Sequence, residues 1–260
     1  MNNFNSVLLE HATPKDFEFF VRQLDSPLNF SASTSMNALL RRFMISADQK
    51  DKEALCSIID EELRYAGSSD IAFFLRNLCG SHGAIEGTEL IADVARKLKV
   101  KLEPVASMED KLASLLQRFF EKSVSEMSLE ELEQCLGSSR VSEAKKKEIL
   151  WQVERSAMSF LPAILIMVLG KVVVKQLLQD LVYLYVVKYA TKEAGKIAAR
   201  EFGKRVSSSY LGPIGLGITI GWSIFDLQGP AFRNTMPAVL YLGVMILRRQ
   251  CKSNEEGCAA

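Results

Sequence analysis

The feature that most constrains this chain is a long segment between residues 206 and 247 that is almost free of charge. Twenty consecutive residues, Val206–Phe225, carry no charged side chain, and after a short polar joint fourteen more, Asn234–Leu247, are also uncharged. Basic residues border the segment, with Arg205 directly before it and Arg248 directly after it. Such a segment either lies in lipid or fills the centre of a helical core.

Charge divides the chain into two unlike halves. Residues 1–155 contain 25 acidic and 20 basic residues, whereas residues 156–260 contain 12 basic and 6 acidic residues. Attraction between the two halves is the simplest interpretation, because it needs no partner. The alternative is that the basic half attracts anionic lipid or nucleic acid. We do not expect nucleic acid, since the basic cluster at residues 96–101 suits the end of a helix dipole and lacks interleaved aromatic side chains.

The sequence contains no pattern typical of an enzyme or of a metal site. Its five cysteines are scattered without a C-x-x-C pair, which favours a reduced, cytoplasmic environment. The first residues do not resemble a secretory signal. The two histidines, His11 and His82, are far apart, and no Gly-x-Ser-x-Gly motif is present. We therefore expect no catalytic, cofactor-binding or metal-binding residues.

The acidic half is expected to be entirely helical. Apolar residues recur in it at helical spacing, and no alternating run of β-branched residues interrupts them. Thr13-Pro14 predicts the start of a helix, because threonine caps helices and proline fits the first helical position. Asp51–Ala66 predicts another helix, with Gly67 at its C-terminal cap. Ser107-x-x-Asp110 is typical of a capping box and predicts a further helix start.

The second half combines apolar and basic segments. Fifteen residues, Ser156–Gly170, are uncharged, and residues 156–174 include only Lys171, which approaches the roughly 20 apolar residues that cross a membrane. Basic residues spaced four apart in Thr191–Val206 share one face of a predicted helix: Lys192, Lys196, Arg200 and Lys204. This pattern is typical of an amphipathic helix on an anionic membrane, and an ordinary solvated face explains it equally well.

Small residues in the first uncharged arm predict close helix packing. The arm contains Gly212, Pro213, Gly217 and Gly221, and glycines four apart let helices approach closely. A helical Val206–Phe225 would be about 30 Å long, but the second arm would reach only about 21 Å. These lengths favour a packed, partly inserted hairpin over two complete membrane spans. We predict that the four residues, like the four basic ones, contact a membrane or a partner.

The joint between the arms predicts a chain reversal held by a charged pair. Gly229-Pro230 supplies a turn, and Pro237 is expected to begin the second arm, where its missing N–H does no harm. Arg233 lies between the arms, and we expect it to bind Asp226 or helix-end carbonyls as a structural latch. Arg248 is expected to be free at the rim.

Several short motifs resemble a known family. The segment 229–239, with Arg248-Arg249 after it, is similar to the C-terminal signature of the bacterial YaaW family, and Leu211–Gly215 is similar to its Gly-Pro-x-Gly turn. Two patches of the first half also resemble that family: Ile71-Ala72 with Leu75-Arg76, and Asp93-Val94 with Lys97-Leu98-Lys99. The family's front half is grouped with ubiquinol–cytochrome c chaperone-like proteins, so the resemblance implies a helical assembly factor.

These observations predict an all-α protein with an acidic helical domain over residues 1–155, a basic apolar domain with a Gly-rich hairpin over residues 156–250, and a flexible tail over residues 251–260. We expect a non-enzymatic, chaperone-like interaction or assembly protein that is cytoplasmic and peripheral to, or partly inserted in, the inner membrane. Its expected partner is anionic membrane lipid, an inner-membrane protein or a second copy of the chain. The alternative is an effector that permeabilises membranes by inserting the hairpin.

Overall fold

The computed structural model describes residues 3–25, 30–67, 85–102, 107–138, 141–171, 173–175, 177–178, 194, 196–197, 200 and 230–257. The elements are α1 (Asn5–His11), α2 (Pro14–Gln23), α3 (Phe30–Ser46), α4 (Gln49–Ala66), α6 (Gly87–Lys97), α7 (Met108–Ser125), α8 (Leu129–Ser138), α9 (Glu143–Glu154), the 3₁₀ helix η1 (Met158–Phe160), α10 (Leu161–Leu169) and α14 (Pro230–Gly257). Within these residues there are helices and loops and no strand, so the predicted all-α fold is confirmed.

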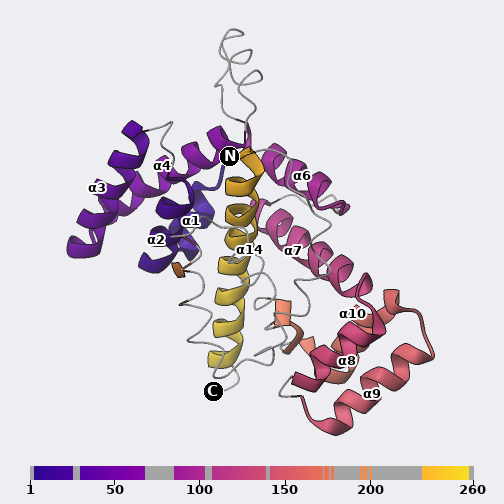
Figure 1. Ribbon diagram of the computed structural model, residues 1–260. Coiled ribbons are helices and arrows are strands. Elements are labelled where there is room, and N and C mark those ends of the chain that lie inside the picture. The colour runs from indigo at the N-terminus through magenta and orange to yellow at the C-terminus, as the bar shows by residue number, and fades with distance from the viewer. Residues whose placement is uncertain are drawn as a thin grey trace.

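Helix α14 runs through the middle of the molecule, with α1 to α4 on one side and α6 and α7 on the other (Figure 1). It contacts α7, α1, α4, α6 and α2. Every residue from Thr235 to Leu247 is buried. The second uncharged arm therefore fills the centre of a helical core, one of the two alternatives that its sequence allows. The first arm, Val206–Phe225, lies outside the described residues.

Helix α14 is central because apolar side chains cover all of its sides between residues 235 and 247, so it is stable in water only when neighbours surround it. Gly243 lets α7 approach closely. A Cβ atom at Gly243 would lie 2.5 Å from the Leu116 Cδ1 and 3.3 Å from the Leu112 carbonyl oxygen. The ring of Tyr241 stacks on that of Phe19, with 4.1 Å between their centroids.

Helix boundaries follow the local signals of the sequence. Thr13 and Asp16 form a capping box at the start of α2, and Ser107 accepts a hydrogen bond from the Asp110 N–H at the start of α7. Gly67 caps α4 as predicted, but its φ of −78° is open to any residue. What requires glycine there is space, since a Cβ would lie 2.5 Å from the Leu90 Cδ1 of α6.

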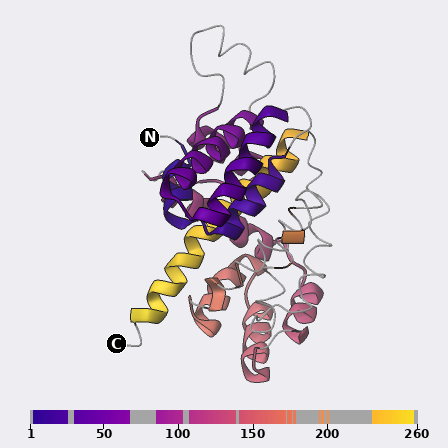
Figure 2. The ribbon, with the colours of Figure 1, turned by 90° about the vertical axis from the view of Figure 1, so that its left-hand side faces the viewer.

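The helices α8, α9 and α10, with η1, lie at the far end of α7 (Figures 1 and 2). α10 and η1 pack against α7, and α9 packs against α10 and α8. Side chains of α10 that face these neighbours are buried, among them Leu161, Ile164 and Leu165. The helix ends at Gly170, whose φ of 86° lies in the left-handed region that favours glycine.

Ion pairs join the basic second half to the acidic first half. Arg248 pairs with Asp16 at 2.5 Å, Arg249 with Glu10 at 3.2 Å, and Arg200 with Glu18 at 3.4 Å. These contacts agree with attraction between the halves, while the division into domains at residue 155 stays a prediction. α14 continues as a helix to Gly257, so the tail predicted for residues 251–260 begins within it.

Each helix in the described part of the chain is either too short or too polar to cross a bilayer.

Candidate functional site

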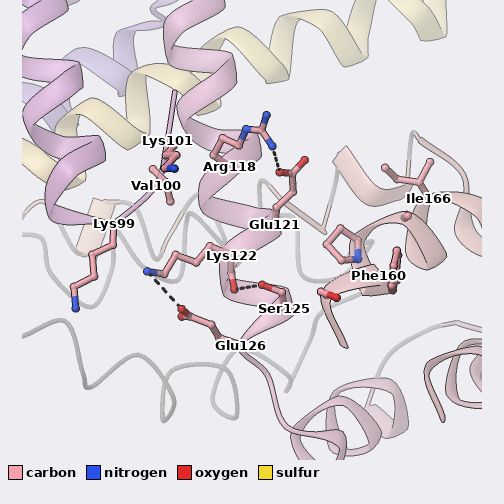
Figure 3. A pocket seen from close by; sticks show the side chains of 13 residues that line it. Lys99, Val100, Lys101, Arg118, Glu121, Lys122, Ser125, Glu126, Phe160 and Ile166 are labelled. Atoms are coloured by element: carbon pink, nitrogen blue, oxygen red, sulfur yellow. Dashed lines mark hydrogen bonds and ion pairs between the residues drawn. The ribbon is translucent and has the colours of Figure 1, made fainter. Parts of the chain in front are cut away.

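A cleft with a volume of about 780 Å³ opens where α6 ends, beside the second half of α7 and the start of α10 (Figure 3). Three kinds of wall meet in it. The chain after α6 supplies lysines, α7 supplies paired charges, and η1 with α10 supplies apolar side chains. We refer to it below as the basic-apolar cleft.

The basic wall is made by Lys99 and Lys101, which are both exposed. The backbone places Lys99 in an unusual conformation, with a φ of 55°. The Lys99 N–H donates to the Arg96 carbonyl at 3.1 Å and the Val100 N–H donates to the Ala95 carbonyl at 2.9 Å. These two bonds form a Schellman motif, in which glycine usually occupies the position of Lys99.

The α7 wall carries charges that balance one another. Arg118 Nη1 lies 2.8 Å from Glu121 Oε2, and Lys122 Nζ lies 3.5 Å from Glu126 Oε1. Both pairs follow the helical spacing at which side chains meet on one face. The excess positive charge of the cleft therefore comes from Lys99 and Lys101, which make no ion pair with any described residue.

The apolar wall is formed by Phe160, Pro162, Ala163 and Ile166. Phe160 is 60% exposed, and Met167, the next residue after Ile166, is 62% exposed. Phe160 ends η1, and Ile166 and Met167 belong to α10, whose other apolar residues, such as Ile164 and Leu165, are buried. A group of exposed apolar side chains beside free cations is typical of a surface that contacts a partner or a membrane.

The structure places two of the four basic residues predicted to form one helix face. Lys196 and Arg200 are both exposed and line a second cleft, of about 710 Å³, with α2 and α3. Their common position agrees with the shared face that their spacing predicts. Arg200 also pairs with Glu18, so part of its charge serves contact between the halves. The remaining predicted contact residues lie outside the described residues: Lys192, Lys204, Gly212, Pro213, Gly217 and Gly221.

One part of the predicted joint, the position of Pro237, requires correction. Pro237 does not begin the second arm, because α14 already begins at Pro230 and holds Pro237 inside it, buried. Pro230 takes the place expected for Pro237, and Gly229, where the turn was predicted, lies outside the described residues. Asp226 and the side chain of Arg233 lie outside the described part of the chain.

Arg248, expected to be free at the rim, is instead the residue that ties α14 to α2. Its guanidinium donates to both carboxylate oxygens of Asp16, at 3.0 and 2.5 Å, and Tyr241 Oη donates to the same carboxylate at 2.9 Å. Burial alone would raise the pKa of Asp16, but the hydrogen bond and charge of Arg248, with help from Thr13, hold it below its ordinary value of 3.8. Nothing in the sequence indicates this contact, because Asp16 near the start of α2 is explained by helix capping alone.

The buried thiol of Cys56 is unsuited to act as a nucleophile. Cys56 is buried in α4, and burial raises the pKa of its thiol to about 12, so the thiolate nucleophile is scarce at neutral pH.

One group of possible metal ligands occurs in the described residues. Glu10, His11 and Glu109 offer ligand atoms within 4.8 Å of one another, and His11 Nε2 lies 3.1 Å from Glu109 Oε1. Arg249 already pairs with Glu10, and Arg248 donates to the His11 carbonyl. Two guanidinium groups this close oppose a divalent cation. We therefore interpret the group as an ion-pair cluster between α1, α7 and α14.

Comparison with known proteins gives a distant relative. No protein-family model matches the chain, and no solved structure matches it. The chain is 27% identical over 201 residues to a UPF0174 protein of Helicobacter pylori (strain J99), which covers 76% of this chain and 73% of the relative. This similarity supports a relation to an uncharacterised bacterial family. The resemblance to the YaaW family and to chaperone-like proteins stays a prediction.

Proposed function

We propose that the protein is a non-enzymatic interaction or assembly module, chaperone-like in kind, that binds the cytoplasmic surface of a membrane containing anionic lipid. The observation that supports this most is the basic-apolar cleft, where the exposed Phe160 lies on one wall and Lys99 and Lys101, which pair with no described residue, lie on another. Apolar side chains enter the headgroup region, and cations attract anionic lipid. Peripheral proteins combine these two forces because either one alone binds weakly.

The expected strength is that of reversible binding. Insertion of the exposed Phe160 and Met167 contributes about 1 kcal/mol each, since part of each side chain is already buried. Lys99 and Lys101 add about 1 kcal/mol each near an anionic surface. The total of about 4 kcal/mol corresponds to a dissociation constant near 1 mM. The predicted basic face that includes Lys196 and Arg200 would raise the affinity by adding further cations.

Vesicle co-sedimentation tests the proposal. The protein should bind vesicles of phosphatidylglycerol and phosphatidylcholine, and bind pure phosphatidylcholine much less. Phe160→Ser combined with Met167→Ser should weaken binding about 30-fold. Trp151→Ser is the matched control, because Trp151 is an aromatic residue of similar exposure, 55%, but belongs to α9 and does not line the cleft.

Two results would contradict the proposal. One is a double variant that binds like the wild type, and the other is a wild-type protein that does not bind anionic vesicles. In the second case, binding to native membranes but not to pure lipid would indicate an inner-membrane protein as the partner.

A membrane-permeabilising effector remains the alternative function. Insertion of the complete hairpin would have to withdraw residues 235–247 from the core, where all of them are buried. Peripheral binding is favoured because it uses side chains that are already exposed and leaves the core intact. Release of a trapped dye from vesicles on binding would support the effector instead.

A further inference from the structure

We propose that the basic-apolar cleft holds one anionic phospholipid, with its headgroup against the basic wall that carries Lys99 and Lys101. The acyl chains would lie against the apolar wall of η1 and α10. This inference rests on the proposed function and specifies the class of lipid and the residues that bind it.

The backbone of Lys99 is the first observation. Its φ of 55° lies in the left-handed region, where a Cβ is crowded by the backbone, so glycine adopts it more readily than any other residue. Glycine would complete the same Schellman motif without that crowding. The chain thus places an exposed cation at a position where glycine would make the fold more stable. Strain of this kind, held by a well-formed turn, is typical of a functional position.

The charge balance of the cleft is the second observation. The cations of α7 are matched by Glu121 and Glu126, so only Lys99 and Lys101 are available to an anion. A lysine ammonium is a point charge that binds phosphate oxygens well. Figure 3 shows the two side chains extending from one wall of the cleft in different directions, so this wall as a whole presents positive charge to an anionic headgroup.

The opposite wall decides which phosphate compound fits. Phe160 and Ile166 offer an apolar surface that a free phosphate ion cannot use. A phospholipid uses both walls, because its headgroup is anionic and its chains are apolar. The volume of about 780 Å³ suits the headgroup and the first part of the chains, and falls in the usual range for ligand sites.

The left-handed conformation of Lys99 allows an experiment in which stability and lipid binding change in opposite directions. Lys99→Gly should raise the melting temperature by about 2–4 °C, because it relieves the left-handed backbone. The same change should weaken binding to phosphatidylglycerol vesicles roughly fivefold, because one lysine is lost. A variant that is more stable yet binds less cannot be explained by loss of folding. Lys101→Gln should weaken binding to a similar extent without the gain in stability.

Two control variants separate the site from general effects. Ala47→Gly relieves the other left-handed non-glycine residue, whose φ is 51°, and should raise the melting temperature without changing binding. Lys50→Gln removes an exposed lysine of α4, outside the cleft, and should leave binding nearly unchanged.

The inference is overturned if Lys99→Gly binds like the wild type, or if Lys50→Gln weakens binding as much as Lys99→Gly. It is also overturned if inorganic phosphate displaces the protein from vesicles at a concentration equal to that of the lipid, since this would identify a free phosphate site. In each case, wild-type binding that still depends on Phe160 would leave the proposed function standing.

Discussion

Asp16 lies where α2 and α14 meet, and it is only 1% exposed. Its carboxylate accepts hydrogen bonds from the Thr13 N–H, from Tyr241 and from Arg248. The helix cap and the contact between the two halves of the chain thus share one buried charge. A buried carboxylate is tolerated only when its partners are complete, so each partner should matter for stability.

Arg248→Ala should therefore lower the free energy of unfolding by about 3 kcal/mol, because it leaves a buried carboxylate without its cation. Arg249→Ala is the matched control. Arg249 is the next residue, but its side chain is 55% exposed and its pair with Glu10 is on the surface, so the loss should stay under about 1 kcal/mol. Urea denaturation of the two variants measures the difference. Equal losses would show that Asp16 does not depend on Arg248.

The lowered pKa of Asp16 predicts that the difference in stability between the wild type and Arg248→Ala depends on pH. Since the pKa of Asp16 is lowered in the folded state, its contribution to stability is present above the unfolded value of 3.8 and is lost as the pH falls through the folded value. The stability gap between the wild type and Arg248→Ala should therefore narrow in acid. Asp60 acts in the opposite sense, because burial raises its pKa, but it is present in both proteins and cancels in the difference. A gap independent of pH down to 3 would contradict this.

At the scale of elements, α14 and α7 make a close contact in the core, and Gly243 makes it possible. Gly243→Ala should destabilise the protein by about 1–3 kcal/mol, because the added methyl group meets Leu116. Leu116→Ala should cost about 2–5 kcal/mol by leaving a cavity. The double variant should cost less than the sum, since each change makes room for the other. Strictly additive losses would contradict the packing of these two helices.

The helix boundaries that the sequence predicted correctly are those marked by local capping residues. Thr13, Gly67 and Ser107 mark real helix boundaries, because caps depend on neighbouring residues. The predicted start of the second arm at Pro237 was wrong, since α14 begins at Pro230, a residue predicted to lie in a turn. The partner of Arg248 is 232 residues away in the chain, so no local pattern could indicate it.

At the scale of the whole molecule, the cleft joins segments that the sequence showed separately. The basic cluster at residues 96–101 and the uncharged Ser156–Gly170 were both visible, but only the packing of α7 between them places them together. The position of the second uncharged arm could not be predicted either. Its composition suits lipid and core equally, and the surrounding helices decide between them.

Whether α14 stays in the core during membrane binding can be tested most directly with a disulfide. A Cβ at Gly243 would lie 2.7 Å from the Leu116 Cγ, so cysteines at these two positions are close enough to join α14 to α7. The protein with Gly243→Cys and Leu116→Cys is oxidised, and its binding to phosphatidylglycerol vesicles is compared with that of the reduced form. Gly243→Cys alone, under the same conditions, is the control.

Peripheral binding through the cleft predicts that the oxidised and reduced forms bind equally well, because α14 never leaves the core. Loss of binding on oxidation, with recovery on reduction, would contradict it and show that α14 must separate from α7 to reach the membrane.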